Sequence, residues 1–286
     1  MELFQLRSFL QVAEEGSITR ASEALYLTQP AVTQHVRALE RELGAPLFDR
    51  TGRGVQLTEA GFVLRDYARR SLAALGECRE AILDLESGAT GRLAIGAGVT
   101  TCIFNLPGPL REFGQANPAV DLVVRTGRSR EVAQWVLGRE IHLGLVTSPV
   151  ERQELTSVEL FSEEIVLVGP PEHGVPIEKG LILFPHGSGF RDYIDRALAG
   201  TPFVVKMETD SVEAIKSFVR AGLGVSLLPL SSVEVEIRAG QLMRLDTDGL
   251  PQLTRATSVI YRTDRYLTSA ARKFIQLLCE RCNSGK

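Results

Sequence analysis

The sequence predicts a small helical N-terminal domain with a two-stranded wing, a long linker helix, and a C-terminal α/β domain of two lobes. Three observations lead to this fold class. Helical periodicity over residues 3–43 is followed by two short strands, heptad spacing then extends to about residue 86, and beyond a short linker apolar runs alternate with helical stretches. The predicted domains are therefore residues 1–58, 59–90 and 91–286.

The composition is that of a globular protein. The 286 residues are 44% hydrophobic and 23% charged, which allows two or three compact units with buried cores. The chain contains no run of about 18 uncharged apolar residues, and its N-terminus lacks the basic start and apolar stretch of a secretory signal. We expect a cytoplasmic protein with no membrane partner.

Charge and cysteine content limit the classes of partner. The net charge is −3, and the first 58 residues carry six arginines against seven carboxylates, so a nucleic-acid partner must be argued from the arrangement of residues. The four cysteines are too scattered for a disulfide framework, and the Cys279/Cys282 pair has no second pair with which to hold zinc. The histidines show no metal-ligand spacing. We therefore expect no metal and no cofactor.

The N-terminal domain is predicted to start with three helices. A helix over residues 3–14 ends at Gly16, and Ser17 is a suitable N-cap for a second helix over residues 18–25. The third helix starts with Thr28 as its N-cap, and a proline in its first turn is tolerated because that N–H has no helical partner. These signals predict the order of elements in a helix-turn-helix.

The third helix has a buried stripe and an opposite polar face. The polar face carries Gln29, Thr33, Gln34 and Arg37. Such groups suit base edges in the major groove, because Gln favours adenine, Arg favours guanine and a Thr methyl suits thymine. Two short strands follow with Arg53 at the turn between them, a wing tip that could enter a minor groove or hold a phosphate. The alternative is a helix face that is merely solvated.

The linker helix, which begins after Thr58 and extends to about residue 86, has apolar and small residues at alternating steps of four and three. At 1.5 Å per residue its length would be roughly 43 Å, too long to be covered by a small domain. We therefore predict a contact with a second copy of the chain through Leu64, Leu75, Ile82 and Leu85. A helix packed on its own protein is the alternative.

The C-terminal pattern predicts parallel sheets in two lobes, the first at about residues 91–162 and 265–286 and the second at about 163–264. Thr100 and Thr101 follow a predicted strand and precede a helix. A helix start offers free N–H groups and the positive end of a dipole, which suits a carboxylate or another small anion. Hydroxyl residues at helix starts are usually only caps, and this alternative stays open.

Four segments of the first 61 residues form an ordered motif: Gly16-Ser17-Ile18-Thr19-Arg20-Ala21-Ser22, Leu27-Thr28-Gln29-Pro30-Ala31-Val32-Thr33, Leu43-Gly44-Ala45-Pro46-Leu47-Phe48 and Leu57-Thr58-Glu59-Ala60-Gly61. This motif closely resembles the N-terminal winged helix-turn-helix domain of LysR-type transcriptional regulators. A looser resemblance continues through the whole chain. It implies a DNA-binding regulator, not an enzyme, that binds an interrupted palindrome near its own gene and switches promoter activity on binding a small anionic metabolite.

The resemblance also implies partners and site residues. The long helix would form a dimer, dimers would pair into tetramers, and RNA polymerase is a further partner that the family admits. The C-terminal part resembles a periplasmic-binding-protein-like effector domain, in which Ser129, Thr147 and Thr209 would converge with Thr100 and Thr101 on one cleft. The DNA-binding residues would be Thr28, Gln29, Pro30, Thr33, Gln34, Arg37 and Arg53.

One departure from the family pattern concerns the recognition helix. Gln34 and His35 stand where many relatives carry basic residues, so the resemblance does not imply which bases are read.

A protein of another class is the alternative: an α/β small-molecule enzyme that carries a helical N-terminal domain. Its sequence signals are incomplete. The Gly96-x-Gly98 pair lacks the third glycine of a dinucleotide fingerprint, because Thr101 stands there. Residues 185–189 look like a nucleophile elbow, but His186 occupies a position that requires glycine. Saturable ligand binding without product would favour the regulator.

Overall fold

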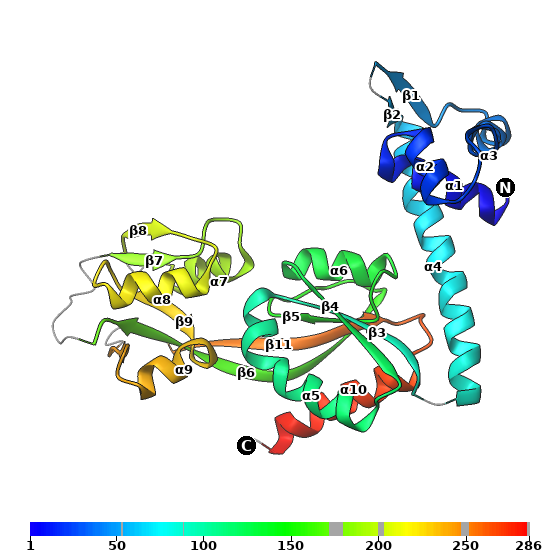
Figure 1. Cartoon of the computed structure of the whole chain (residues 1–286). Coiled ribbons are helices and arrows are strands. Elements are labelled where there is room, and N and C mark those ends of the chain that lie inside the picture. Colours follow the sequence, from blue (N-terminus) through cyan, green and yellow to red (C-terminus); the bar gives the residue numbers. More distant parts are fainter. Residues whose placement is uncertain (53, 88, 172–179, 200–202, 247–251, 285–286) are drawn as a thin grey trace. The chain divides into compact units, whose positions relative to one another are not determined.

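The chain folds into two compact units, Met1–Ile82 and Leu83–Lys286. The computed structural model describes residues 1–52, 54–87, 89–171, 180–199, 203–246 and 252–284 (Figure 1). Among these residues, no helix combines the length and the apolar character needed to cross a membrane. The predicted functional boundaries after residues 58 and 90 do not coincide with the division into compact units, and they stay a prediction.

The first unit contains three helices, a hairpin and most of a long helix. Its elements are α1 (Leu3–Glu15), α2 (Ile18–Ala24), α3 (Gln29–Leu43), β1 (Phe48–Thr51), β2 (Gly54–Leu57) and α4 (Glu59–Ser87). The side chains of Ser17 and Thr28 accept backbone N–H groups in the first turns of α2 and α3. Gly16 and Gly44 end α1 and α3 in the left-handed conformation, with φ of 61° and 68°, which glycine adopts at little cost.

The hairpin of β1 and β2 is held against the turn that follows α1. The Val55 N–H donates to the Gly16 carbonyl oxygen at 3.0 Å. A Cβ atom added to Gly54 would lie 2.3 Å from the same oxygen, so only glycine permits this approach. The wing is therefore attached to the helical core by a backbone contact that depends on glycine.

The core of the first unit is formed by α1, α3 and the beginning of α4. Phe9, Leu39 and Leu47 are fully buried there. Leu64 and Ala68, which lie on α4, pack into the same cluster. The first turns of the linker helix thus belong to the N-terminal domain.

The largest sheet of the second unit is mixed. Its strands are β3 (Gly91–Ala97), β4 (Val120–Thr126), β5 (Leu143–Val146), β6 (Leu155–Gly169), β9 (Ser226–Pro229), β10 (Met243–Arg244) and β11 (Leu253–Arg262). Strand β3 pairs in parallel with β4 and β5, whereas β11 pairs antiparallel with β5 and β6, and β6 pairs antiparallel with β9 and β10. The prediction of parallel sheets is correct for β3, β4 and β5 of this sheet, and wrong for its other strands.

The long strands β6 and β11 run side by side through both lobes (Figure 1). Their pairing extends from Leu253 opposite Ile165 to Arg262 opposite Leu155. The sequence indicates a strand by a short apolar run only at residues 165–168 of β6 and 258–261 of β11. The rest of each strand alternates buried and exposed residues, so a search for apolar runs does not find it.

The helices lie at the two ends of this strand pair. The first lobe carries the π-helical turn η1 (Thr101–Asn105), α5 (Pro107–Ala116), α6 (Ser129–Leu137) and α10 (Ser269–Ser284). The second lobe carries α7 (Gly189–Ala197), α8 (Val212–Arg220), α9 (Leu230–Arg238) and the parallel pair β7 (Leu181–Leu183) and β8 (Val205–Glu208). The predicted lobe boundary after residue 162 falls inside β6, which the lobes share.

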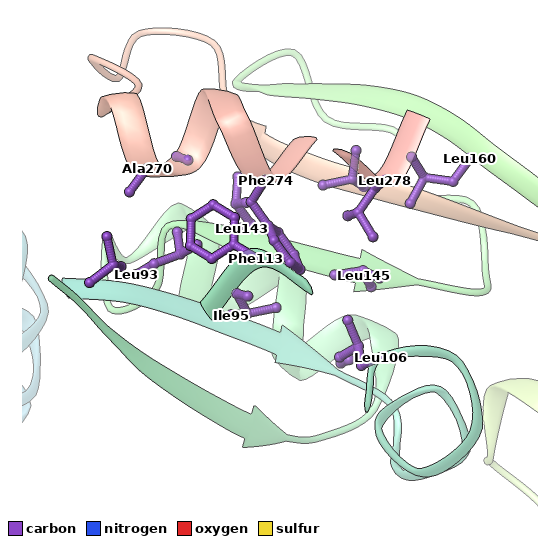
Figure 2. Close-up of a cluster of buried hydrophobic side chains, with 14 residues drawn as sticks. Leu93, Ile95, Leu106, Phe113, Leu143, Leu145, Leu160, Ala270, Phe274 and Leu278 are labelled. Carbon is purple, nitrogen blue, oxygen red and sulfur yellow. The ribbon is translucent and has the colours of Figure 1, made fainter. Parts of the chain in front are cut away.

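Each lobe has its own core on both faces of its sheet. In the first lobe, α5 and α10 cover one face and α6 the other, and Figure 2 shows the cluster under α5 and α10. Phe113 and Phe274 meet edge to face there, with ring centroids 5.2 Å apart. In the second lobe one buried cluster includes residues of α7 and another includes residues of α8 and α9.

Candidate DNA interface and effector site

The helix α3 presents one polar face and buries the other. Val32, Val36 and Leu39 lie in the core, whereas Gln34 and Arg37 are exposed. The exposed face borders a broad depression of about 930 Å³. Five predicted DNA-binding residues line this depression together: Gln29, Pro30, Thr33, Gln34 and Arg37.

The other two predicted DNA-binding residues are Thr28 and Arg53. Thr28 is the N-cap of α3, where its side-chain oxygen accepts the Ala31 N–H at 3.4 Å, so it orients the helix. Arg53 lies outside the described residues. His35, the departure from the family pattern, points to the protein interior: its Nδ1 lies 2.8 Å from Ser8 Oγ and its ring meets Phe4 edge to face. A packing role thus explains the imidazole at this position.

The four residues predicted to form a dimer contact divide into two groups. Leu64 is only 8% exposed and packs in the core of the first unit, so its predicted role at an interface is corrected to a core role. Leu75, Ile82 and Leu85 are 49%, 55% and 76% exposed. These three exposed residues form an apolar stripe along α4, as a helix that pairs with another copy requires.

The last turns of α4 are anchored to the first lobe through Asp84. This carboxylate is 4% exposed and accepts hydrogen bonds from the Ser269 N–H at 2.9 Å, the Ser269 hydroxyl at 3.0 Å and the Tyr266 hydroxyl at 3.1 Å. Ser269 is the first residue of α10, so Asp84 satisfies donors at the N-terminus of that helix. Sequence reasoning missed this residue, because its partners are more than 180 positions away.

Replacing Asp84 with alanine should lower the free energy of unfolding of the second unit by about 1–3 kcal/mol, because Tyr266 and Ser269 lose hydrogen bonds to a buried, charged acceptor. Urea unfolding followed by circular dichroism measures this change. The matched control is Asp121→Ala, which removes an exposed carboxylate from β4. Equal stability of the two variants would contradict the anchoring role.

A hydrogen bond joins two of the five predicted effector residues. Ser129 and Thr147 lie together, since the Thr147 N–H donates to Ser129 Oγ at 3.2 Å. Thr100 is half-buried before η1, and Thr101 is 1% exposed. Thr209 accepts the Ser211 N–H at 3.4 Å, a cap-like contact. Ser129 and Thr147 therefore fit a shared ligand site best, and the roles of all five residues stay predictions.

Two cavities adjoin the Ser129–Thr147 pair. The first, of about 630 Å³, lies against β6, β11 and α7 and includes Thr147 and Arg255 in its lining. The second, of about 740 Å³, lies at the N-terminal ends of α6 and α7 and includes Ser129. Thr100, Thr101 and Thr209 line neither cavity. The two cavities share residues 148–150 and Arg196, which sequence reasoning did not single out.

The loop that leads into α7 is held by a buried arginine. Arg191 is 4% exposed, and its guanidinium donates to Asp195 at 2.7 Å, to Glu208 at 2.8 Å and to the Phe184 carbonyl oxygen. Its remaining nitrogen lies 2.9 Å from His186 Nε2. Burial alone would lower the pKa of Arg191, but the hydrogen bonds to the two carboxylates outweigh it and raise the pKa above its usual value. The start of α7 is thereby fixed at the cavity wall.

Models of known families match nearly the whole chain. A model described as "Bacterial regulatory helix-turn-helix protein, lysR family" matches residues 3–62, and one described as "LysR substrate binding domain" matches residues 86–283. The chain belongs to the LysR family. It is a ligand-responsive, DNA-binding transcriptional regulator, so the predictions of family, of fold class and of a regulator in place of an enzyme are confirmed.

Relatives of this LysR-family regulator match it over almost its full length. It is 33% identical to "Probable RuBisCO transcriptional regulator" of Trichormus variabilis over 292 residues, covering 96% of the chain and 86% of the relative. It is 31% identical to "RuBisCO operon transcriptional regulator" of Allochromatium vinosum, covering 96% and 94%. These relatives are regulators by name, in agreement with the family.

Solved structures of the LysR family share the fold. The regulator CbnR, in a crystal structure of the full-length protein with its target DNA, superposes with a TM-score of 0.73 at 24% identity and covers 99% of this chain and 100% of that one. The regulator LysG of Corynebacterium glutamicum, solved with bound effector Arg, gives a TM-score of 0.63 at 21% identity, covering 99% of each chain. At this identity the likeness supports the two-part LysR architecture alone.

Proposed function

We propose that two copies of α3 and its wing read an interrupted palindrome near the gene of this regulator, and that a small anionic metabolite held between the lobes switches promoter activity. The observation that carries the DNA part is the depression along α3, where glutamine, threonine and arginine side chains lie together. These groups match the hydrogen-bonding pattern of base edges in the major groove. Thr28 caps α3 and Pro30 stands in its first turn, so these two residues set where the helix begins. Arg53 would contact phosphate or the minor groove.

Self-association follows from the long helix. The exposed residues Leu75, Ile82 and Leu85 support a helix pair between two copies, and a two-fold dimer matches a palindromic operator. Pairing of dimers into a tetramer and contact with RNA polymerase complete the proposed assembly on DNA.

A footprint of the purified protein on the DNA upstream of its own gene tests the proposal, with excess competitor DNA and at two salt concentrations. We expect a protected site of approximate two-fold symmetry that survives the competitor. Binding that the competitor removes and that disappears at the higher salt concentration would reflect phosphate attraction alone, and would overturn the proposal.

The dimer is tested by placing charges on the exposed stripe. Leu75→Glu combined with Ile82→Glu should convert the dimer into monomers in sedimentation velocity, because each copy would bring buried, unpaired carboxylates into the interface. Arg79→Glu, an exposed change on the same helix, is the control. An intact dimer in the double variant would mean that α4 pairs through another face, or not at all.

A further inference from the structure

Tyr26, in the turn between α2 and α3, has a backbone conformation that tyrosine rarely adopts. Its φ is 55°, in the left-handed region. Its N–H donates to the Glu23 carbonyl oxygen at 3.1 Å. The next N–H, of Leu27, donates to the Ser22 carbonyl oxygen at 2.9 Å, so the pair of bonds closes the C-terminal end of α2. Glycine or asparagine is the usual residue at such a position, because a bulky side chain is strained there.

The side chain of Tyr26 makes no contact that compensates for this strain. It is 96% exposed, and its hydroxyl has no hydrogen-bond partner in the part of the chain that the structure describes. Tyrosine at this position therefore makes the free domain less stable than glycine would, since glycine adopts a positive φ without steric cost.

One other residue shows that a strained side chain can be explained by the fold. Among the described residues, Arg139 is the second non-glycine residue with a positive φ, at 61°. Its guanidinium lies 3.1 Å from the carboxylate of Asp264, and its side chain is only 18% exposed. Strain that a contact inside the chain does not explain points to a role in function. Tyr26 meets this condition and Arg139 does not.

Tyr26 lies beside the end of α3 that is assigned to DNA. It stands two residues before Thr28, the N-cap of α3, and Gln29 and Pro30 in the next turn line the depression along this helix. In helix-turn-helix proteins the N-terminal residues of the second helix contact base edges, whereas the first helix crosses the phosphate backbone. The turn that joins the two helices therefore lies next to the phosphates at the edge of the groove.

A phenol suits a phosphate at that edge. Its hydroxyl donates a hydrogen bond, and tyrosine is among the neutral side chains that contact phosphate oxygens in DNA complexes. Its ring also extends the donor farther from the backbone than serine or asparagine can. A long, neutral donor on an otherwise strained and exposed turn is thus explained by an acceptor outside the chain.

We propose that the Tyr26 hydroxyl donates a hydrogen bond to a phosphate oxygen of the operator, at the edge of the major groove that holds α3. This contact sets the position of α3 on the duplex and reads no base. The inference rests on the proposed function, because it takes α3 to lie in the groove.

Tyr26→Phe removes the hydroxyl and keeps the ring and the backbone strain. Fluorescence anisotropy should show at least about threefold weaker binding to a labelled operator fragment, since a hydrogen bond to a charged group is lost. Binding to unrelated DNA of the same length should weaken by the same factor. Tyr67→Phe, which removes another exposed hydroxyl from the same unit, is the control. Unchanged affinity would overturn the proposal, and a loss on the operator alone would assign Tyr26 to a base.

Tyr26→Gly separates a role in DNA binding from a role in folding. Because glycine relieves the strain, the first unit should unfold at the same or a higher temperature in differential scanning calorimetry of the full chain, while operator affinity falls at least as far as in Tyr26→Phe. A lower unfolding temperature with unchanged operator affinity would make Tyr26 a structural residue and overturn the proposal.

The acceptor is located by replacing operator phosphates one at a time with uncharged methylphosphonates. The unmodified protein should lose affinity at one phosphate in each half-site where Tyr26→Phe loses nothing further. Additive losses at every phosphate would refute the contact.

The variant with alanine at Thr33 and Arg37 distinguishes this inference from the proposed function. Weak operator binding in that variant, with unchanged binding in Tyr26→Phe, refutes the phosphate contact alone. Weaker binding of Tyr26→Phe to unrelated DNA, without any operator footprint of the unmodified protein, refutes the sequence-reading proposal alone.

Discussion

Replacing Thr33 and Arg37 together with alanine should weaken operator binding by about 1–3 kcal/mol for each base contact that is lost. Both side chains line the depression along α3, and neither belongs to the buried stripe that holds the helix. The change should therefore reduce affinity without unfolding the domain. Fluorescence anisotropy with a labelled operator fragment measures the affinity, and circular dichroism checks the fold.

A matched control separates base reading from general charge loss. Arg111→Ala removes one positive charge from the second unit and should leave operator affinity within about twofold, in keeping with the small effect of a distant charge in salt. Loss of affinity with an unchanged slope against salt would indicate lost base contacts, whereas a reduced slope would indicate a lost phosphate contact. Unchanged affinity and an unchanged footprint in the double variant would remove α3 from the interface.

Replacing Phe274 with alanine should lower the free energy of unfolding of the second unit by about 3–5 kcal/mol. The side chain is fully buried between α10 and the sheet, and its ring meets that of Phe113 (Figure 2). Removing it leaves a cavity that the surrounding β-strands cannot collapse to fill. Urea unfolding, monitored by circular dichroism, gives the change.

The control for this core variant is Leu223→Ala. Leu223 is 42% exposed in the same unit, so its truncation should cost about 0.5 kcal/mol or less. Phe274→Leu, which keeps part of the volume, should fall between the two. A loss below about 1 kcal/mol for Phe274→Ala would mean that α10 is not part of the cooperative core.

The local elements of the first unit are predictable because their signals are close in sequence. Ser17 and Thr28 cap helices that start at the next residue, and Gly16 and Gly44 end helices at the preceding one. A cap depends on a side chain and an N–H within three residues, so no tertiary information is needed. The polar face of α3 follows from the same helical spacing.

Two residues have surroundings that local sequence patterns did not predict, because residues distant in the sequence contact them. Leu64 keeps the heptad spacing of α4, yet it is buried by α1 and the segment after α3, so spacing alone assigned it to the wrong surface. His35 is turned inward by Ser8 on another helix. Periodicity predicts which face of a helix is apolar, but it does not predict which other segment or subunit packs on that face.

The sequence by itself determined the family, the helix-turn-helix with its wing, the linker helix and the two-lobed α/β character, because each follows from local caps, periodicity or an ordered motif. Only the tertiary structure decided the antiparallel pairing of β6 with β11, the anchoring of Asp84, and the meeting of Ser129 with Arg196 at one cavity. These features join segments that are about 65 to 185 residues apart in the chain. Such contacts form only when the whole core has closed, so no local pattern encodes them.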